Sequence, residues 1–149
     1  MAARTARISC GWLALALALA AGPSGCSRTP PEQALRQTIA GLEDAAEKRD
    51  AAALRDGLAE DFVGPGGMDE RGLARMAQGV FLRHKDINAN LGPLDMDVRG
   101  ESATVRFTAA LTGGQGLLPD SGQVYDVDTE WRLEDGEWRL VRANWKPQL

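Results

Sequence analysis

From Ile87 to the end of the chain, apolar residues recur at nearly every second position, which is the pattern of β-strands with one buried face. The alternating segments are residues 87–91, 94–98, 103–111, 125–133 and 138–145. Asp135-Gly136, between the last two segments, is a strong signal for a two-residue hairpin turn. The sequence therefore predicts a meander of three or four long antiparallel strands that ends in a hairpin.

The residues before this meander follow the helical period instead. Leu35, Ile39 and Leu42 form one apolar stripe in a helix predicted from Pro31 to about Lys48. Asp50 is expected to cap a second, shorter helix that runs through Leu54 and Leu58 and ends near Glu60. We expect a brief strand at residues 61–63 before the breaker cluster at 64–67.

A third helix is predicted after Asp69, which is placed to cap it. Its apolar positions fit the spacing of one helix face and are Leu73, Met76, Ala77, Val80 and Phe81. Helices followed by strands indicate an α+β domain in which three N-terminal helices pack in the concave face of a curved antiparallel sheet. Sheets curved in this way enclose a pocket between sheet and helices.

The first 25 residues have the pattern of a secretory signal rather than of a folded helix. Arg4 and Arg7 precede an apolar stretch, and no acidic residue lies among them. The stretch from Gly11 to Gly22 is 12 residues long, whereas a membrane-spanning helix needs about 20. We therefore expect residues 1–25 to be a signal peptide, 26–31 a short tether, and 32–147 the folded domain.

Ser24-Gly25-Cys26 resembles the end of a lipobox, in which a cysteine is lipidated and becomes the new N-terminus. Pro23 departs from the pattern, because lipoboxes usually hold an aliphatic residue there. By resemblance to lipoproteins, a palmitate-bearing Cys26 followed by Ser27 implies an outer-membrane protein that faces the periplasm. If Pro23 prevents processing, cleavage after Ala18-Leu19-Ala20 would give a soluble periplasmic protein.

Composition excludes several classes of function. The only cysteines are Cys10 and Cys26 and the only histidine is His84, so no cysteine–histidine metal cluster can form and no cofactor is implied. The formal net charge is −4, and loss of the signal arginines makes it two units more negative. An acidic domain without a basic cluster is a poor nucleic-acid binder. Membrane attachment would come from lipid on Cys26.

Three stretches carry a resemblance to a known family, and together they span nearly the whole domain. Residues 46–54, 58–62 and 131–141 resemble the helix bend, the entry to the first strand and the closing hairpin of the nuclear transport factor 2-like superfamily. This superfamily has a cone-shaped fold and includes ketosteroid isomerase and SnoaL-like proteins. The same fold serves enzymes, carriers and interaction modules, so it does not settle the function.

The resemblance implies where isomerase catalysis would need its groups. The carboxylate base falls in residues 64–66, which hold no carboxylate, and the tyrosine donor falls on Leu42. The protonated aspartate falls at Thr129, with Asp128 one residue away on the other face of a strand. None of the three roles is filled, so the sequence predicts no catalytic residue of this type.

The predicted hairpin suggests ligand-binding candidates instead. Pairing outward from the turn places Thr129 opposite Arg142 and Val127 opposite Asn144. On the apolar face of the hairpin the polar groups are then Tyr125, Thr129, Arg142 and Asn144. If that face lines the pocket, Arg142 could hold an anionic ligand. The alternative is that these side chains lie at the rim, solvated or ion-paired.

The same register places Asp126, Asp128 and Glu130 on the opposite face, where we expect a solvated row rather than a metal site. It also places Trp145 on that face, which the family that the chain resembles often uses for dimerisation, so the resemblance implies a homodimer. The leading hypothesis is an envelope lipoprotein with a non-catalytic domain that binds a small molecule or a protein partner. The alternatives are a lyase, isomerase or hydrolase acting through the same pocket, and a dimeric scaffold.

Overall fold

The computed structural model describes residues 28–114 and 121–148. The signal peptide, Cys26 and the expected lipid attachment lie outside these residues. The elements are α1 (Pro31–Glu47), α2 (Ala51–Asp56), β1 (Leu58–Val63), the 3-10 turn η1 (Pro65–Gly67), α3 (Glu70–Arg83), β2 (Asp86–Leu91), β3 (Asp95–Arg99), β4 (Ser102–Gly114), β5 (Ser121–Glu134) and β6 (Glu137–Pro147). No helix among the described residues is long and apolar enough to cross a membrane.

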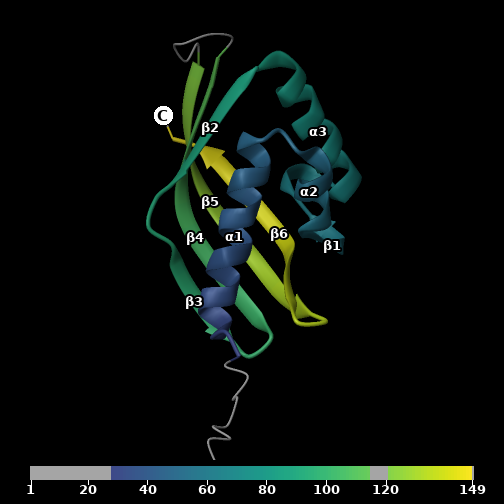
Figure 1. The fold of residues 1–149 in the computed structure, drawn as a ribbon, viewed down its shortest axis with the longest axis vertical. Coiled ribbons are helices and arrows are strands. Elements are labelled where there is room, and N and C mark those ends of the chain that lie inside the picture. The colour runs from purple at the N-terminus through teal and green to yellow at the C-terminus, as the bar shows by residue number, and fades with distance from the viewer. Residues whose placement is uncertain (1–27, 115–120, 149) are drawn as a thin grey trace, which may run out of the picture.

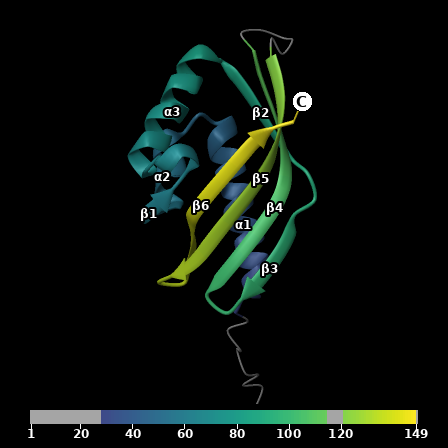
Figure 2. The same ribbon diagram turned by 180° about the vertical axis from the view of Figure 1, so that it is seen from behind.

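The strands form one curved sheet in the order β1-β6-β5-β4-β2, and β3 pairs with β4 beyond the end of β2. All pairs in the meander are antiparallel, and β1 joins the other edge parallel to β6. Helix α1 lies across the concave side, while α2 and α3 lie beside it next to β1 (Figure 1). The opposite side of β4, β5 and β6 carries no helix (Figure 2). The expected α+β architecture, with helices packed on a curved antiparallel sheet, is confirmed.

The helix starts follow the predicted capping chemistry. The Asp50 carboxylate accepts hydrogen bonds from the backbone N–H groups of Ala52 and Ala53, at 3.1 and 2.9 Å. The Asp69 carboxylate accepts one from Gly72 N at 2.7 Å. These bonds satisfy N–H groups that have no partner within the helix, so each aspartate fixes where its helix begins.

Helix α2 ends earlier than predicted, and Leu58 lies in β1 rather than in the helix. Gly57 follows the last helical residue, and its carbonyl accepts a 3.0 Å hydrogen bond from Leu140 N of β6. This bond draws the chain into the sheet one residue after the helix. The predicted strand at 61–63 is therefore the second half of a strand that begins at Leu58.

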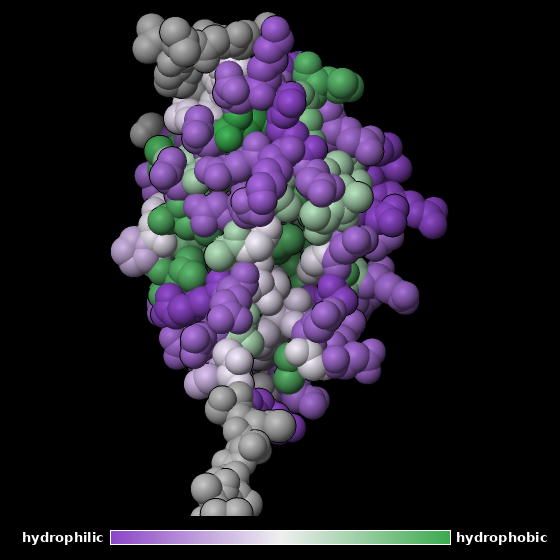
Figure 3. Space-filling view, viewed as in Figure 1, coloured by the Kyte–Doolittle hydropathy of each residue, from purple (hydrophilic) through white to green (hydrophobic). Residues whose placement is uncertain are grey.

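The core lies between α1 and the concave face of the sheet. Leu35 and Val105 are fully buried, and Trp131 and Trp138 pack in the same cluster at 4 % and 2 % exposure. Partly buried apolar side chains complete this cluster, among them Leu42, Leu73, Phe107 and Trp145. From the α1 side the surface is mostly hydrophilic, and apolar side chains appear in separate patches (Figure 3).

The hairpin between β5 and β6 turns at Asp135-Gly136 as predicted, with φ of 50° and 82°. Its register differs from the prediction beyond the first four pairs. Trp131 pairs with Leu140 as expected, but Glu130 pairs with Arg142 and Thr129 with Ala143. Val141 is an extra residue in β6, and this bulge moves every later β6 side chain to the other face.

Candidate functional site

The bulge separates the four predicted ligand-binding residues. Thr129 is buried on the concave face and Tyr125, four residues earlier on β5, is half-buried on the same face. Arg142 and Asn144 are exposed on the outer face, opposite Glu130 and Asp128. The prediction that all four share one face is therefore wrong, because it assumed an unbroken register from the turn.

Arg142 is already paired on the outer face. Its Nε lies 3.5 Å from Oε2 of Glu130, and both side chains are more than half exposed. An exposed pair of this kind contributes little to stability, about 0–1 kcal/mol. The outer face also carries Arg106, whose Nε donates to Asp128 at 3.1 Å. The carboxylate row of β5 is thus a solvated face with cationic neighbours.

Trp145 lies opposite Val127 and packs against the core cluster. The prediction that placed it on the acidic face is wrong for the same reason of register. The suggestion of a homodimer loses this basis and stays a prediction.

Thr129 is the one buried polar side chain among the described residues, at 6 % exposure. Its hydroxyl donates a 2.9 Å hydrogen bond to the carbonyl of Val105 and accepts a 2.8 Å bond from Nε1 of Trp131. A hydroxyl has one proton to donate, and that proton is already used within the fold. Thr129 therefore holds β4 and β5 together and supports the indole of Trp131.

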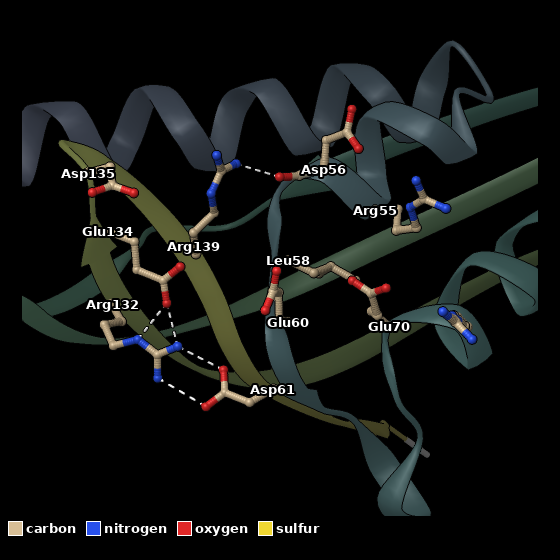
Figure 4. Close-up of a pocket in the computed structure, with 11 residues that line it drawn as sticks. Arg55, Asp56, Leu58, Glu60, Asp61, Glu70, Arg132, Glu134, Asp135 and Arg139 are labelled. Carbon is tan, nitrogen blue, oxygen red and sulfur yellow. Dashed lines mark hydrogen bonds and ion pairs between the residues drawn. The ribbon is translucent and has the colours of Figure 1, made fainter.

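A charged cleft of about 700 Å³ lies away from the concave face, where α2, β1, the start of α3 and the β5–β6 hairpin meet (Figure 4). Its lining is mostly ionic and comprises Arg55, Asp56, Leu58, Glu60, Asp61, Glu70, Arg71, Arg132, Glu134, Asp135 and Arg139. Six of these side chains are carboxylates and four are guanidinium groups. We take this cleft as the candidate site.

Arg132 is held from two sides in this cleft. Its Nη2 and Nη1 donate to the two carboxylate oxygens of Asp61, at 2.7 and 3.2 Å, and its Nε donates to Glu134 at 2.6 Å (Figure 4). The hydrogen bond from Arg132 lowers the pKa of Asp61 from its usual range, and the two carboxylates raise the pKa of Arg132. Both groups therefore stay ionised near neutral pH, and the pair links β1 to β5 across the cleft.

Arg139 is also occupied, since it donates to the carbonyl of Asp56 and to the carboxylate of Glu137. Within the described part of the chain, the side chains of Arg55, Arg71, Glu60, Glu70 and Asp135 form no hydrogen bond or ion pair, and they remain available to a ligand. No group of three or more histidine, cysteine, aspartate or glutamate side chains in 28–114 and 121–148 is placed to hold a metal ion.

Sequence reasoning missed this cleft. Its walls come from four elements, and the carboxylate that holds Arg132 lies 71 positions earlier in the chain. No local spacing brings such residues together. The signal that the sequence did offer was modest, namely charged residues on both sides of the predicted hairpin turn.

No protein-family model matches the chain, and no curated protein matches it in sequence. Its fold does match solved structures. A nuclear transport factor 2-like superfamily protein from Salmonella enterica superposes with a TM-score of 0.67 at 14 % identity, over 79 % of this chain and 91 % of that one. A Novosphingobium aromaticivorans protein of the same type with a cystatin-like fold gives 0.64 at 22 % identity, over 76 % and 79 %.

Bdellovibrio bacteriovorus Bd1075 superposes with a TM-score of 0.69 at 14 % identity, over 78 % of this chain. The chain spans only 41 % of that protein's length, so it matches one part of a larger molecule. The protein therefore has the nuclear transport factor 2-like fold, a cystatin-like arrangement of helices on a curved sheet, as the sequence motifs predicted. At these identities the likeness establishes the fold and not the activity.

Proposed function

We propose that this chain is an envelope lipoprotein whose nuclear transport factor 2-like domain is a non-catalytic binding module. The observation that carries the proposal is the chemistry of the concave face. Thr129 is the buried polar side chain there, and its hydroxyl already donates a hydrogen bond to the carbonyl of Val105. Acid–base or nucleophilic catalysis needs a titratable or activated group in contact with the substrate.

The positions that the isomerase would use support this reading. Leu42 packs against the core, Gly64 is buried without a side chain, and Thr129 supports Trp131. Each position serves packing or backbone geometry rather than proton transfer. The proposal assigns binding instead to the charged cleft, where several ionised side chains lack partners.

The lipoprotein part of the proposal rests on the sequence, with two arginines, an apolar stretch too short to span a membrane, and Ser24-Gly25-Cys26. The five-residue tether before α1 suits a domain carried close to an anchor. Outer-membrane placement, with the domain in the periplasm, follows from Ser27.

A second candidate function is a small-substrate lyase or hydrolase. It is favoured by one structural neighbour, a Novosphingobium aromaticivorans protein proposed to be a scytalone dehydratase, at 12 % identity and a TM-score of 0.68. An enzyme of this kind would need a general acid or base facing its substrate. Of the described residues, the unpartnered carboxylates that line a hollow are in the cleft and not on the concave face.

The proposed lipidation of Cys26 is tested by the mass of the N-terminal peptide of protein purified from membranes of its native host. A diacylglyceryl-modified Cys26 is expected. An unmodified N-terminus near Ala21 would overturn the lipoprotein proposal and make a diffusible substrate the better hypothesis. A Pro23→Leu variant serves as control, since it restores an aliphatic residue to the lipobox.

A further inference from the structure

The start of the folded domain lies close to the charged cleft. Nε1 of Trp138 donates a 3.2 Å hydrogen bond to the carbonyl of Pro31, the first residue of α1. The next residue of β6, Arg139, lines the cleft. The first turn of α1 and the β5–β6 turn lie at the same end of the molecule (Figure 1). The N-terminal tether therefore leaves the domain near the β5–β6 hairpin, on the Trp138 face of β6, and the same hairpin forms one wall of the cleft through Arg139 on the other face.

This placement limits how far the cleft can be from a lipid on Cys26. Four residues separate Cys26 from Pro31, and the five steps from Cα to Cα span at most about 3.5 Å each in an extended chain, so roughly 18 Å. If Cys26 carries lipid, as the proposed function holds, the end of the domain that holds the β5–β6 hairpin stays close to the head groups of the same membrane.

The unpartnered side chains of the cleft carry both signs of charge. Arg55 from α2 and Arg71 from α3 offer guanidinium groups, and Glu60 and Asp135 offer carboxylates. Arg132 and Arg139 add no net positive charge, because carboxylates already hold them. The lining as a whole has two more carboxylates than guanidinium groups, so a lone phosphate is repelled. A simple cation leaves Arg55 and Arg71 unused.

We propose that the cleft binds a zwitterion that carries a phosphate and a primary ammonium group, the chemistry of phosphoethanolamine. Guanidinium groups donate paired hydrogen bonds to phosphate, and carboxylates accept them from ammonium. As a phosphodiester head group this chemistry is neutral overall, which suits a cleft of mixed charge, and in the free compound the ammonium offsets part of the phosphate charge. The source of this chemistry is either a phosphatidylethanolamine head group in the anchoring membrane or the free compound.

Tethering would let a weak site be occupied. Exposed ionic contacts are individually weak, about 0–1 kcal/mol each. A short flexible tether, however, holds the site at an effective ligand concentration in the millimolar range. Binding of a membrane head group rests on the proposed lipid anchor at Cys26. Recognition of the free compound by the cleft does not.

The test uses the full protein purified from membranes and placed in phosphatidylcholine nanodiscs, with backbone hydrogen exchange of residues 55–61 and 69–73 as the readout. Soluble phosphoethanolamine is expected to slow exchange that requires opening of the cleft, about tenfold at ten times its Kd. Phosphocholine is expected to have a smaller effect, because its quaternary nitrogen has no N–H to donate. Phosphatidylethanolamine in the nanodiscs is expected to slow exchange without added ligand.

The Arg55→Ala/Arg71→Ala variant is expected to lose this slowing. Arg75→Ala is the matched control, because Arg75 is exposed on the same helix but does not line the cleft. Slowing by the soluble compound alone would assign the site to a free zwitterion, and slowing in the nanodisc would assign it to the head group.

No slowing by either source, equal slowing by phosphocholine, or slowing that survives Arg55→Ala/Arg71→Ala would overturn the proposal. Circular dichroism confirms that each variant is folded. The mass of the Cys26 peptide, measured on the same sample, separates failure of the anchor from failure of the cleft.

Discussion

Nε1 of Trp131 donates a 2.8 Å hydrogen bond to Oγ1 of Thr129, two residues earlier on the same strand, and the Thr129 hydroxyl donates a 2.9 Å hydrogen bond to the carbonyl of Val105 in β4. The three groups are buried in the core. A threonine that sequence reasoning placed in a ligand pocket thus supports the buried indole of Trp131.

Removal of this hydroxyl is expected to destabilise the fold. Thr129→Val removes one hydrogen bond to the Val105 carbonyl and leaves the buried Trp131 indole N–H without a partner, and an unsatisfied buried donor costs about 1–3 kcal/mol. Thr129→Ser keeps the hydroxyl and is expected to cost less. Urea unfolding measures both variants. Equal stability of Thr129→Val and wild type would show that the network does not form.

The end of α1 is tied to the edge of the sheet. Oε1 of Glu47 accepts a 3.1 Å hydrogen bond from Ala89 N of β2. Glu47→Ala is expected to lower the free energy of unfolding by about 1 kcal/mol, while Glu47→Gln retains an acceptor and should lose less. If both variants have the same thermal unfolding midpoint, the hydrogen bond between Glu47 and Ala89 contributes nothing to stability.

The buried end of α1 supplies a test of the core. Leu35 is 0 % exposed, and Leu35→Ala should cost about 2–5 kcal/mol, the usual range for a leucine truncated in a packed core. Leu82, at 89 % exposure, is the matched control, and Leu82→Ala should change stability by less than about 0.5 kcal/mol. Denaturant unfolding of the two variants should separate them clearly, and similar losses would argue against this placement of α1.

The cleft pair Asp61–Arg132 predicts a pH dependence. Arg132 lowers the pKa of Asp61 in the folded state, so the pair stabilises the fold above the unfolded pKa, about 3.9. That contribution is lost as pH falls through the lowered folded value. Asp61→Asn should therefore be less stable than wild type at pH 6, and the difference should vanish toward pH 2.

The effect is expected to be small, because the pair is exposed to solvent. Glu60→Gln, at the neighbouring position without an ion pair, serves as the control and should show no such pH dependence. A difference between Asp61→Asn and wild type that persists unchanged at pH 2 would contradict the assigned pair.

Local signals in the sequence predicted much of the fold. Asp50 and Asp69 mark helix starts because their carboxylates satisfy N–H groups within three residues. Asp135-Gly136 marks the hairpin because few residue pairs accept positive φ at both positions. Such features depend on neighbours in the chain, so the sequence contains the information needed to find them.

The register of β6 and the lining of the cleft depend on contacts between residues that are far apart in the sequence. The bulge left a trace in the sequence, because the apolar positions Trp138 and Leu140 are out of phase with Ala143 and Trp145. A strict two-residue count across that change put Arg142 in the pocket. The cleft left no comparable trace, since the partners Asp61 and Arg132 meet only when β1 joins the sheet.

The outward placement of Arg142 takes the predicted cationic ligand group away from the concave face. Disulfide formation measures this placement directly, because Cys26 is the single cysteine after the expected signal. Glu130→Cys with Arg142→Cys should form a disulfide under mild oxidation, since directly paired residues share a face and have a Cα separation within the range of disulfides. Thr129→Cys with Arg142→Cys should remain reduced. If the second pair forms the disulfide and the first does not, Arg142 faces the pocket and the proposed function is contradicted.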